Sequence, residues 1–204
     1  MENTFWRHNA KRLEISGACR PSRKLAKIPV LKPVRPDRAA VPQTPAGPES
    51  GETGSITLEL VSPSHADAQR LIRELDSEIA ALYPDSAING INSIEFDRNG
   101  RYFVLALQAG EAVGCGGFRR VDDCCAEIKR MFVRASARRH GIARQILRHL
   151  EAEIGRQGFS TIVLETGCDN AAALALYQAE GYFPIPAFLG YVGIPISRCF
   201  AKWA

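Results

Sequence analysis

The 204-residue sequence lacks several patterns that would assign it to other protein classes. No run approaches the roughly 20 consecutive apolar residues that a membrane-spanning helix needs, which excludes insertion into a bilayer. The six cysteines form no C-x-x-C pair and no histidine stands at zinc-ligand spacing, so we expect free thiols and no bound metal. The dinucleotide fingerprint G-x-G-x-x-G before a helix is also missing. Because no apolar secretion signal is present, we expect a cytoplasmic protein.

Charge and proline are unevenly distributed along the chain. Residues 1–50 contain ten Lys and Arg, four Asp and Glu, and seven of the 12 prolines. Such a segment cannot bury enough apolar area to offset the entropy lost on ordering. We therefore predict a basic, Pro-rich, mostly disordered extension over residues 1–54 and one domain over residues 55–204. The extension could also bind nucleic acid or act as an organellar address, but a solvated tail is the simpler interpretation, and nucleic acid is not expected as a partner.

The spacing of apolar residues predicts a mixed α/β domain. Alternating or continuous apolar runs predict strands over residues 55–61, 102–108, 113–120, 126–133, 161–165 and 199–203. Helical spacing predicts one helix between an N-cap at Ser64 and Pro84, one directly after residue 141, and one from Asn170 to Gly181. Residues 85–99 are typical of a loop. The order predicts a mostly antiparallel central sheet of six or seven strands flanked by helices.

The most informative segment is the loop at residues 138–143. It consists of Arg138, Arg139, His140, Gly141, Ile142 and Ala143, and Arg144 follows it. A short loop that opens into a helix directs unpaired backbone N–H groups and the positive end of the helix dipole at one point. Gly141 has no Cβ to obstruct an anion, and the arginines offer bidentate contacts to phosphate. We therefore expect this loop to bind a pyrophosphate.

The R-x-x-G-x-A spacing of the loop resembles the pyrophosphate loop of the GNAT superfamily of N-acetyltransferases. Three further segments resemble this family in the same order: residues 126–133 resemble its fourth strand, residues 161–165 its next strand, and residues 170–182, with Asn170, Tyr177 and Gly181, its C-terminal motif. The resemblance runs from about Ile56 to the C-terminus. It implies the GNAT fold, in which the fourth and fifth strands splay apart and hold the pantetheine arm of coenzyme A.

The same resemblance implies roles for single residues. Acetyl-CoA would be the co-substrate, held by backbone groups of Met131, Phe132 and Val133, by residues 138–144 and by Asn170. Tyr177 would protonate the departing thiolate, Glu127 would be the general base, and the N–H of Val133 or Phe132 would hold the oxyanion. The residues themselves leave alternatives open. Tyr177 could be a packing residue, Asn170 only a helix cap, and Glu127 a solvent-facing residue beside an ordered water that acts as the base.

The predicted function is N-acetyl transfer from acetyl-CoA directly to a primary amine of a small or amino-acid-like acceptor. Two alternatives stay open: a protein N-acetyltransferase, and a coenzyme A sensor or inactive family member that binds the coenzyme without transfer. By the resemblance, residues 83–94 and 185–197 would hold the acceptor, whose identity is not predicted. Lys129 and Arg130 are interpreted as cover for strand edges rather than as contacts to an acidic substrate. A homodimer is left open.

Overall fold

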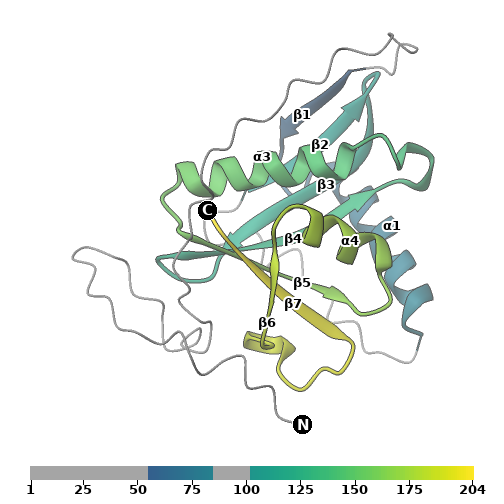
Figure 1. Cartoon of the computed structure of the whole chain (residues 1–204). Coiled ribbons are helices and arrows are strands. Elements are labelled where there is room, and N and C mark those ends of the chain that lie inside the picture. Colours follow the sequence, from purple (N-terminus) through teal and green to yellow (C-terminus); the bar gives the residue numbers. More distant parts are fainter. Residues whose placement is uncertain (1–54, 85–101) are drawn as a thin grey trace, which may run out of the picture.

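The computed structural model describes residues 55–84 and 102–204, so the predictions for residues 1–54 and for the loop at residues 85–99 lie outside the described residues. A seven-stranded sheet with the order β1-β2-β3-β4-β5-β7-β6 forms its centre (Figure 1). The strands are β1 (Ile56–Leu60), β2 (Tyr102–Gln108), β3 (Glu111–Arg120), β4 (Cys125–Val133), β5 (Thr161–Gly167), β6 (Phe183–Ile185) and β7 (Ser197–Trp203). The described helices are α1 (Ala66–Leu82), α3 (Ile142–Arg156) and α4 (Ala171–Ala179), with 3-10 turns η2 (Ala135–Ala137) and η3 (Leu189–Tyr191). Among the strands of the described residues, β4 and β5 alone pair in parallel, which confirms the predicted mixed, mostly antiparallel sheet.

Two details of the secondary structure differ from the predictions. The N-cap of α1 is His65, whose Nδ1 accepts the Asp67 N–H at 3.3 Å, whereas the Ser64 hydroxyl lies 2.7 Å from the hydroxyl of Ser62. Strand β6 was not predicted, because Pro184 stands in its middle. The strand lies at the edge of the sheet, where a residue without an N–H group is tolerated.

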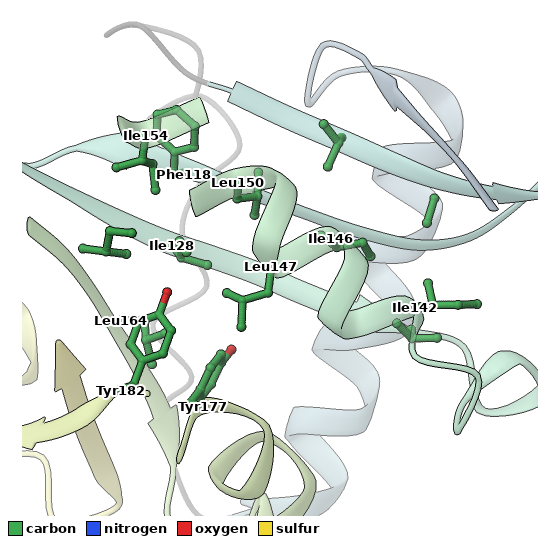
Figure 2. Close-up of a cluster of buried hydrophobic side chains, with 14 of the residues drawn as sticks. Phe118, Ile128, Ile142, Ile146, Leu147, Leu150, Ile154, Leu164, Tyr177 and Tyr182 are labelled. Atoms are coloured by element: carbon green, nitrogen blue, oxygen red, sulfur yellow. The ribbon is translucent and has the colours of Figure 1, made fainter. Parts of the chain in front are cut away.

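The sheet separates two apolar layers. Along β2, Val104 and Ala106 pack in the layer of α3, while Phe103 and Leu105 pack in the layer of α1. This alternation follows from the two-residue period of a strand and places α1 and α3 on opposite faces. Tyr177 of α4 belongs to the α3 layer, so α4 lies on that face as well. Figure 2 shows the side chains that α3 directs into this layer, namely Ile142, Ile146, Leu147, Leu150 and Ile154.

Helix α3 approaches β3 closely because two glycines face it. A Cβ at Gly116 would lie 2.8 Å from Cγ2 of Ile146 and 2.6 Å from Sδ of Met131. A Cβ at Gly114 would lie 3.2 Å from Cδ1 of Ile146. These distances are shorter than normal packing contacts, so larger residues would push the helix away from the sheet. The glycines therefore fix the position of α3, and with it the loop at its N-terminus.

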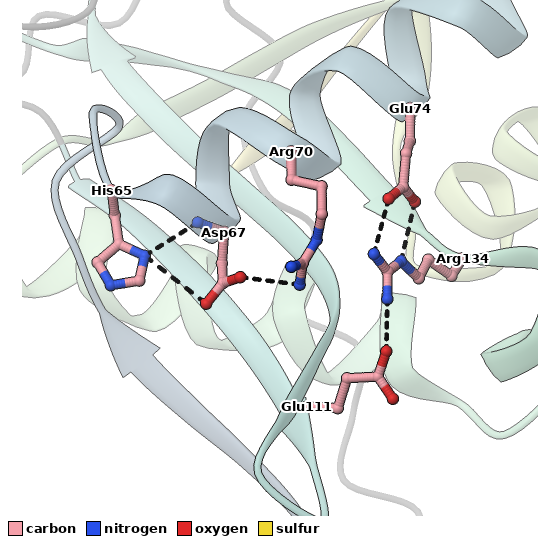
Figure 3. Close-up of polar contacts among 6 residues, drawn as sticks. All are labelled: His65, Asp67, Arg70, Glu74, Glu111 and Arg134. Carbon is pink, nitrogen blue, oxygen red and sulfur yellow. Dashed lines mark hydrogen bonds and ion pairs between the residues drawn. The ribbon is translucent and has the colours of Figure 1, made fainter.

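An arginine ties α1 to the ends of β3 and β4 (Figure 3). Arg134 directly follows β4 and donates two hydrogen bonds to Glu74 of α1, from Nε at 2.9 Å and from Nη2 at 2.7 Å. Its Nη1 donates to Glu111 of β3 at 2.7 Å. Bidentate arginine–carboxylate pairs fix orientation as well as distance. This brace therefore holds α1 against the end of β4, just before the loop at residues 138–143.

Strands β4 and β5 separate part-way along their length. They pair from Cys125 and Thr161 as far as Ile128 and Leu164, although both strands continue beyond these residues. Just after the last pair, Arg130 has a left-handed backbone with a φ of 59°, and the register between β3 and β4 shifts. Such a bulge bends a strand. The bulge therefore accounts for the separation, and the predicted splay is confirmed.

The described residues also bear on the membrane and cysteine predictions. No helix within residues 55–84 and 102–204 combines the length and apolar character needed to cross a bilayer. Cys115, Cys125, Cys168 and Cys199 are free thiols, as predicted. Cys124 is disulfide-bonded, so the prediction of free thiols is wrong at this position.

Candidate active site

A cavity of about 220 Å³ lies where β4 and β5 separate. Residues of α1, β4, β5, α4 and the segment from η3 to β7 line it. The polar groups in its wall include Tyr83, Lys129, Glu165, Tyr177 and Tyr191. Two of these, Tyr83 and Tyr191, fall in the regions expected to hold the acceptor. A concave site with a few converging polar groups is typical of a small-molecule site.

The cavity connects the two faces of the sheet. Ile128 and Leu164, the last paired residues of β4 and β5, pack in the layer of α3. Since neighbouring side chains on a strand point to opposite faces, Lys129 and Glu165 lie on the face of α1. Tyr177 reaches the same cavity from the α3 face. Two reactants could therefore enter from opposite faces and meet in the gap.

Glu127, the predicted general base, is fully buried beside the cavity and does not line it. Its Oε2 accepts from Nε of Arg119 at 2.7 Å, and its Oε1 accepts from Nζ of Lys129 at 3.1 Å and from the Tyr191 hydroxyl at 2.8 Å. The solvent-facing alternative is therefore wrong. Because this carboxylate already pairs with two cations, its geometry is that of a counter-ion rather than a free base.

Glu165 has the position expected of a proton acceptor, and sequence reasoning missed it. Its side chain lines the cavity, and burial raises the pKa of its carboxyl, while a hydrogen bond with Ser197 and the charge of Lys129 oppose the shift. A raised carboxyl pKa brings a general base closer to the range useful at neutral pH. The sequence signal was a single acid that directly follows the apolar run at residues 162–164.

Tyr177, the predicted general acid, both packs in the core and lines the cavity. Its ring lies edge-on to that of Tyr182 (Figure 2), with a centroid distance of 5.7 Å. The centroid of the Phe200 ring is 6.4 Å away. Burial, and then the negative charge of Glu165, raise the pKa of the Tyr177 phenol well above its ordinary value. The phenol therefore stays protonated at neutral pH. Its packing and its predicted proton donation are compatible.

The loop before α3 has the backbone expected of an anion site. Gly141 is the N-cap of α3 with a left-handed φ of 75°, and Arg139 has a φ of 73°. Backbone hydrogen bonds end with Arg138 N–H to Ala135 C=O and resume with Gln145 N–H to Gly141 C=O, and no backbone carbonyl of the described residues accepts from the intervening amides. A Cβ at Gly141 would meet nothing within 4 Å. The glycine is thus required by backbone conformation, in addition to the predicted access for an anion.

Two of the three arginines predicted to contact phosphate are held elsewhere. Arg138 donates to Glu78 of α1 at 2.6 and 2.7 Å and to the carbonyl of Val133 at 2.8 Å. Arg144 donates to Glu180 at 2.6 Å. Arg139 is exposed and makes no ion pair within the described residues. Acids on neighbouring elements thus bind two of the three guanidinium groups, and contacts of all three with phosphate stay a prediction.

The remaining loop residues contribute mainly backbone groups. His140 is exposed, with Nδ1 3.4 Å from the carbonyl of Ala137. Ile142 is buried in the α3 layer, and Ala143 packs partly against it. Their side chains therefore point away from a ligand at the loop, and only their N–H groups could bind a phosphate.

The direction of the β4 amides separates Phe132 from Val133. The N–H of Arg134 donates to Val113 C=O on β3 at 2.8 Å. Since amides alternate in direction along a strand, the N–H of Phe132 also points to β3, and that of Val133 points into the gap. The contact of Arg138 with Val133 C=O agrees with this direction. Met131 lines the cavity as well.

Asn170 lies at the edge of the cavity and caps α4. Its Oδ1 accepts the N–H of Ala173 at 3.2 Å, which confirms the capping alternative. Its amide nitrogen has no part in this hydrogen bond. Within the described part of the chain, no group of three or more His, Cys, Asp or Glu could hold a metal ion.

Comparison with known proteins identifies the family of the chain. The model of the Acetyltransferase (GNAT) family matches residues 62–182, which include β4, the loop at residues 138–143 and α4. The chain belongs to the GNAT family of acetyltransferases. The enzyme is 32% identical over 149 residues to an IAA acetyltransferase of Azospirillum brasilense, a match that covers 72% of this chain and 97% of the relative. The predicted family, enzyme class and fold are thus confirmed.

Solved structures show the same architecture. A protein of Klebsiella pneumoniae, provisionally named an acyl-CoA N-acyltransferase, superposes with a TM-score of 0.61 at 27% identity, covering 72% of this chain and 97% of that protein. A GNAT family acetyltransferase of Elizabethkingia anophelis with acetyl-CoA bound superposes with a TM-score of 0.53 at 18% identity, covering 73% and 98%. At this low identity the second likeness concerns the fold alone.

Proposed function

We propose that this acetyltransferase moves the acetyl group of acetyl-CoA directly to the primary amine of a small, amino-acid-like acceptor. The single observation that carries the proposal is the cavity through the gap between β4 and β5, with Glu165 on the α1 side and Tyr177 on the α3 side. A base and an acid at opposite sides of one small cavity suit a reaction that removes one proton and supplies another. The cavity volume of about 220 Å³ favours a small acceptor.

The reaction needs one proton acceptor and one proton donor. The nitrogen of the neutral amine attacks the thioester carbonyl, a C–N bond forms, and the C–S bond of coenzyme A breaks. Glu165 accepts the proton that the amine loses, and the Tyr177 hydroxyl donates a proton to the departing sulfur. Glu165 replaces Glu127 as the proposed base, because Glu165 lines the cavity and Glu127 is already paired with Arg119 and Lys129.

Backbone groups would hold the coenzyme and the oxyanion. The N–H of Val133 points into the gap, where it can donate to the tetrahedral oxyanion. The backbone amides of residues 139–144, which donate to no backbone carbonyl among the described residues, and the guanidinium of Arg139 would bind the pyrophosphate. The pantetheine arm would lie along residues 131–133. The amide nitrogen of Asn170 would contact the coenzyme from the start of α4.

An amine panel tests the proposal. The full-length enzyme is incubated with acetyl-CoA and a panel of amino acids, amines and short peptides, while free coenzyme A and the acetylated products are measured. We expect stoichiometric release and N-acetylation of a small amine. Calorimetric binding of acetyl-CoA without any transfer would support the sensor alternative. Preference for peptide N-termini over every free amine would support a protein N-acetyltransferase.

A further inference from the structure

Lys129 and Glu165 place opposite charges across the cavity. They follow Ile128 and Leu164, the last residue pair of β4 and β5, so they are the first residues on the two strands that no longer pair. Both lie on the α1 face and both line the cavity. The ion pair of Lys129 is with Glu127, at 3.1 Å, and no direct ion pair joins it to Glu165. The two side chains therefore face one cavity, and their charges interact without a direct ion pair.

The ammonium of Lys129 is held in place by two hydrogen bonds, which leave one of its N–H donors unused by the described residues. It donates to Glu127 and to the hydroxyl of Tyr191, and it lies 5.1 Å from the centroid of the Tyr191 ring. An ammonium has three N–H donors, and described residues use two of them. The third can serve a ligand in the cavity.

The carboxylate that pairs with Lys129 also pairs with a second cation, and the charge of Glu165 acts on Lys129 without an ion pair. Glu127 shares its single negative charge with Arg119, whose Nε lies 2.7 Å from Oε2. Arg119 does not line the cavity, and Arg130, which does, forms an ion pair with Asp76. Because one N–H donor of Lys129 stays unused by the described residues, its ammonium can donate a charge-assisted hydrogen bond to a carboxylate in the cavity. Lys129 is therefore the group in this wall best suited to bind an anionic part of the acceptor.

We propose that the acceptor is a free amino acid or a similar molecule with a carboxylate next to its amine, and that Lys129 selects it by binding this carboxylate while Glu165 faces the amine. The inference rests on the proposed transfer function and names its substrate class. It replaces the interpretation of Lys129 as cover for a strand edge. A plain amine would leave the Lys129 charge facing carbon, and a peptide N-terminus would leave it facing a neutral amide.

Matched acceptors test this inference without any substitution. For the amino acid that the enzyme acetylates best, kcat/KM is compared with that of its carboxamide and of the decarboxylated amine. Rates are expressed per concentration of neutral amine, since the three amines differ in pKa. We expect the acid to be preferred by about 10- to 100-fold, the effect of one charge-assisted hydrogen bond. An amide or plain amine that reacts as well as the acid overturns the inference.

Substitutions assign the preference to Lys129. Lys129→Gln should bring the ratio of kcat/KM for the amino acid to kcat/KM for its carboxamide close to one, while Lys129→Arg should retain most of the preference. Melting temperature and acetyl-CoA affinity show that each variant is folded. An unchanged ratio in a folded Lys129→Gln enzyme overturns the role of Lys129. Failure of the wild-type enzyme to acetylate any compound while it binds acetyl-CoA is a different result, which overturns the transfer function and this inference together.

Discussion

Lys129 and Glu165 stand opposite one another at the first position where β4 and β5 no longer pair. The relationship arises from a bulge at Arg130 in one strand and from a parallel register that ends two residues earlier, at Ile128. It places a cation and a carboxylate on the same face of the sheet, at the mouth of a gap that Tyr177 reaches from the other face. The chemistry proposed for this enzyme therefore follows from where the sheet opens.

Glu127 is fully buried and Glu165 is half-buried, and replacement of each by an uncharged glutamine should have opposite effects on stability. Glu127→Gln removes the counter-ion of Arg119 and Lys129, so we expect the free energy of unfolding to fall by about 3 kcal/mol. Glu165 has a raised carboxyl pKa because burial disfavours its charged form, so Glu165→Gln should raise the melting temperature at neutral pH. Thermal unfolding of both variants at pH 7 checks the contrast. Equal destabilisation by both substitutions would contradict it.

The increase in melting temperature caused by Glu165→Gln should become larger as the pH rises. A carboxyl whose pKa is higher in the folded than in the unfolded state destabilises the fold only when it ionises. The cost is absent below the ordinary pKa of 4.5 and complete above the raised folded pKa. The difference in melting temperature between variant and wild type should therefore grow from acidic to neutral pH. A difference that is constant over this range would show that burial does not disfavour this carboxylate.

Tyr177→Phe tests the general acid. The substitution removes one hydroxyl and keeps the ring contacts with Tyr182 and Phe200, so turnover should fall by roughly 10²- to 10⁴-fold with little change in acetyl-CoA affinity. Tyr182→Phe is the matched control, because Tyr182 is a buried neighbour that does not line the cavity. Near-normal turnover in Tyr177→Phe, with chemistry shown to be rate-limiting, would make Tyr177 a packing residue only.

Gly141→Val tests the anion loop. At a φ of 75° a β-branched residue is strained, so the loop should shift and acetyl-CoA affinity should fall at least about tenfold, the effect of losing one or more charge-assisted hydrogen bonds. Gly158→Val is a control at the other end of α3, with a φ of 85° and open space around its Cβ. Gly158→Val should lower the melting temperature about as much as Gly141→Val does and leave the affinity for acetyl-CoA unchanged. Equal affinity in both folded variants would exclude the loop as the phosphate site.

The two ion pairs of Arg134, with Glu74 and with Glu111, should contribute unequally to stability. Glu74 makes two hydrogen bonds with Arg134, and its side chain is 35% exposed, whereas Glu111 makes one and is 68% exposed. Double-mutant cycles with alanine should give a coupling of about 1 kcal/mol for Arg134 with Glu74 and near zero for Glu111. Equal couplings, measured by denaturant unfolding, would mean that bidentate geometry adds nothing here.

Local signals predicted most of the fold, and long-range contacts explain the errors. Turn residues, caps and apolar spacing were sufficient for β2, α3 and α4, and the family motifs indicated the splay. The edge strand β6 was missed because Pro184 argues against a strand unless its edge position is known. At the site, the partners of Arg138, Arg144 and Glu127 come from distant elements. Sequence spacing could therefore identify these charged residues but not their contacts, and it ranked Glu127 above Glu165.

The most direct test of the account is the rate at which the wild-type enzyme and the Glu165→Gln variant N-acetylate a small amine across a pH series. The account predicts that the wild type acetylates a small amine and that turnover in the variant falls by roughly 10²- to 10⁴-fold near neutral pH, where most of the amine is protonated. The deficit should shrink as the pH rises and neutral amine becomes abundant. A folded variant that binds acetyl-CoA and acetylates the amine at the wild-type rate at every pH would contradict the account.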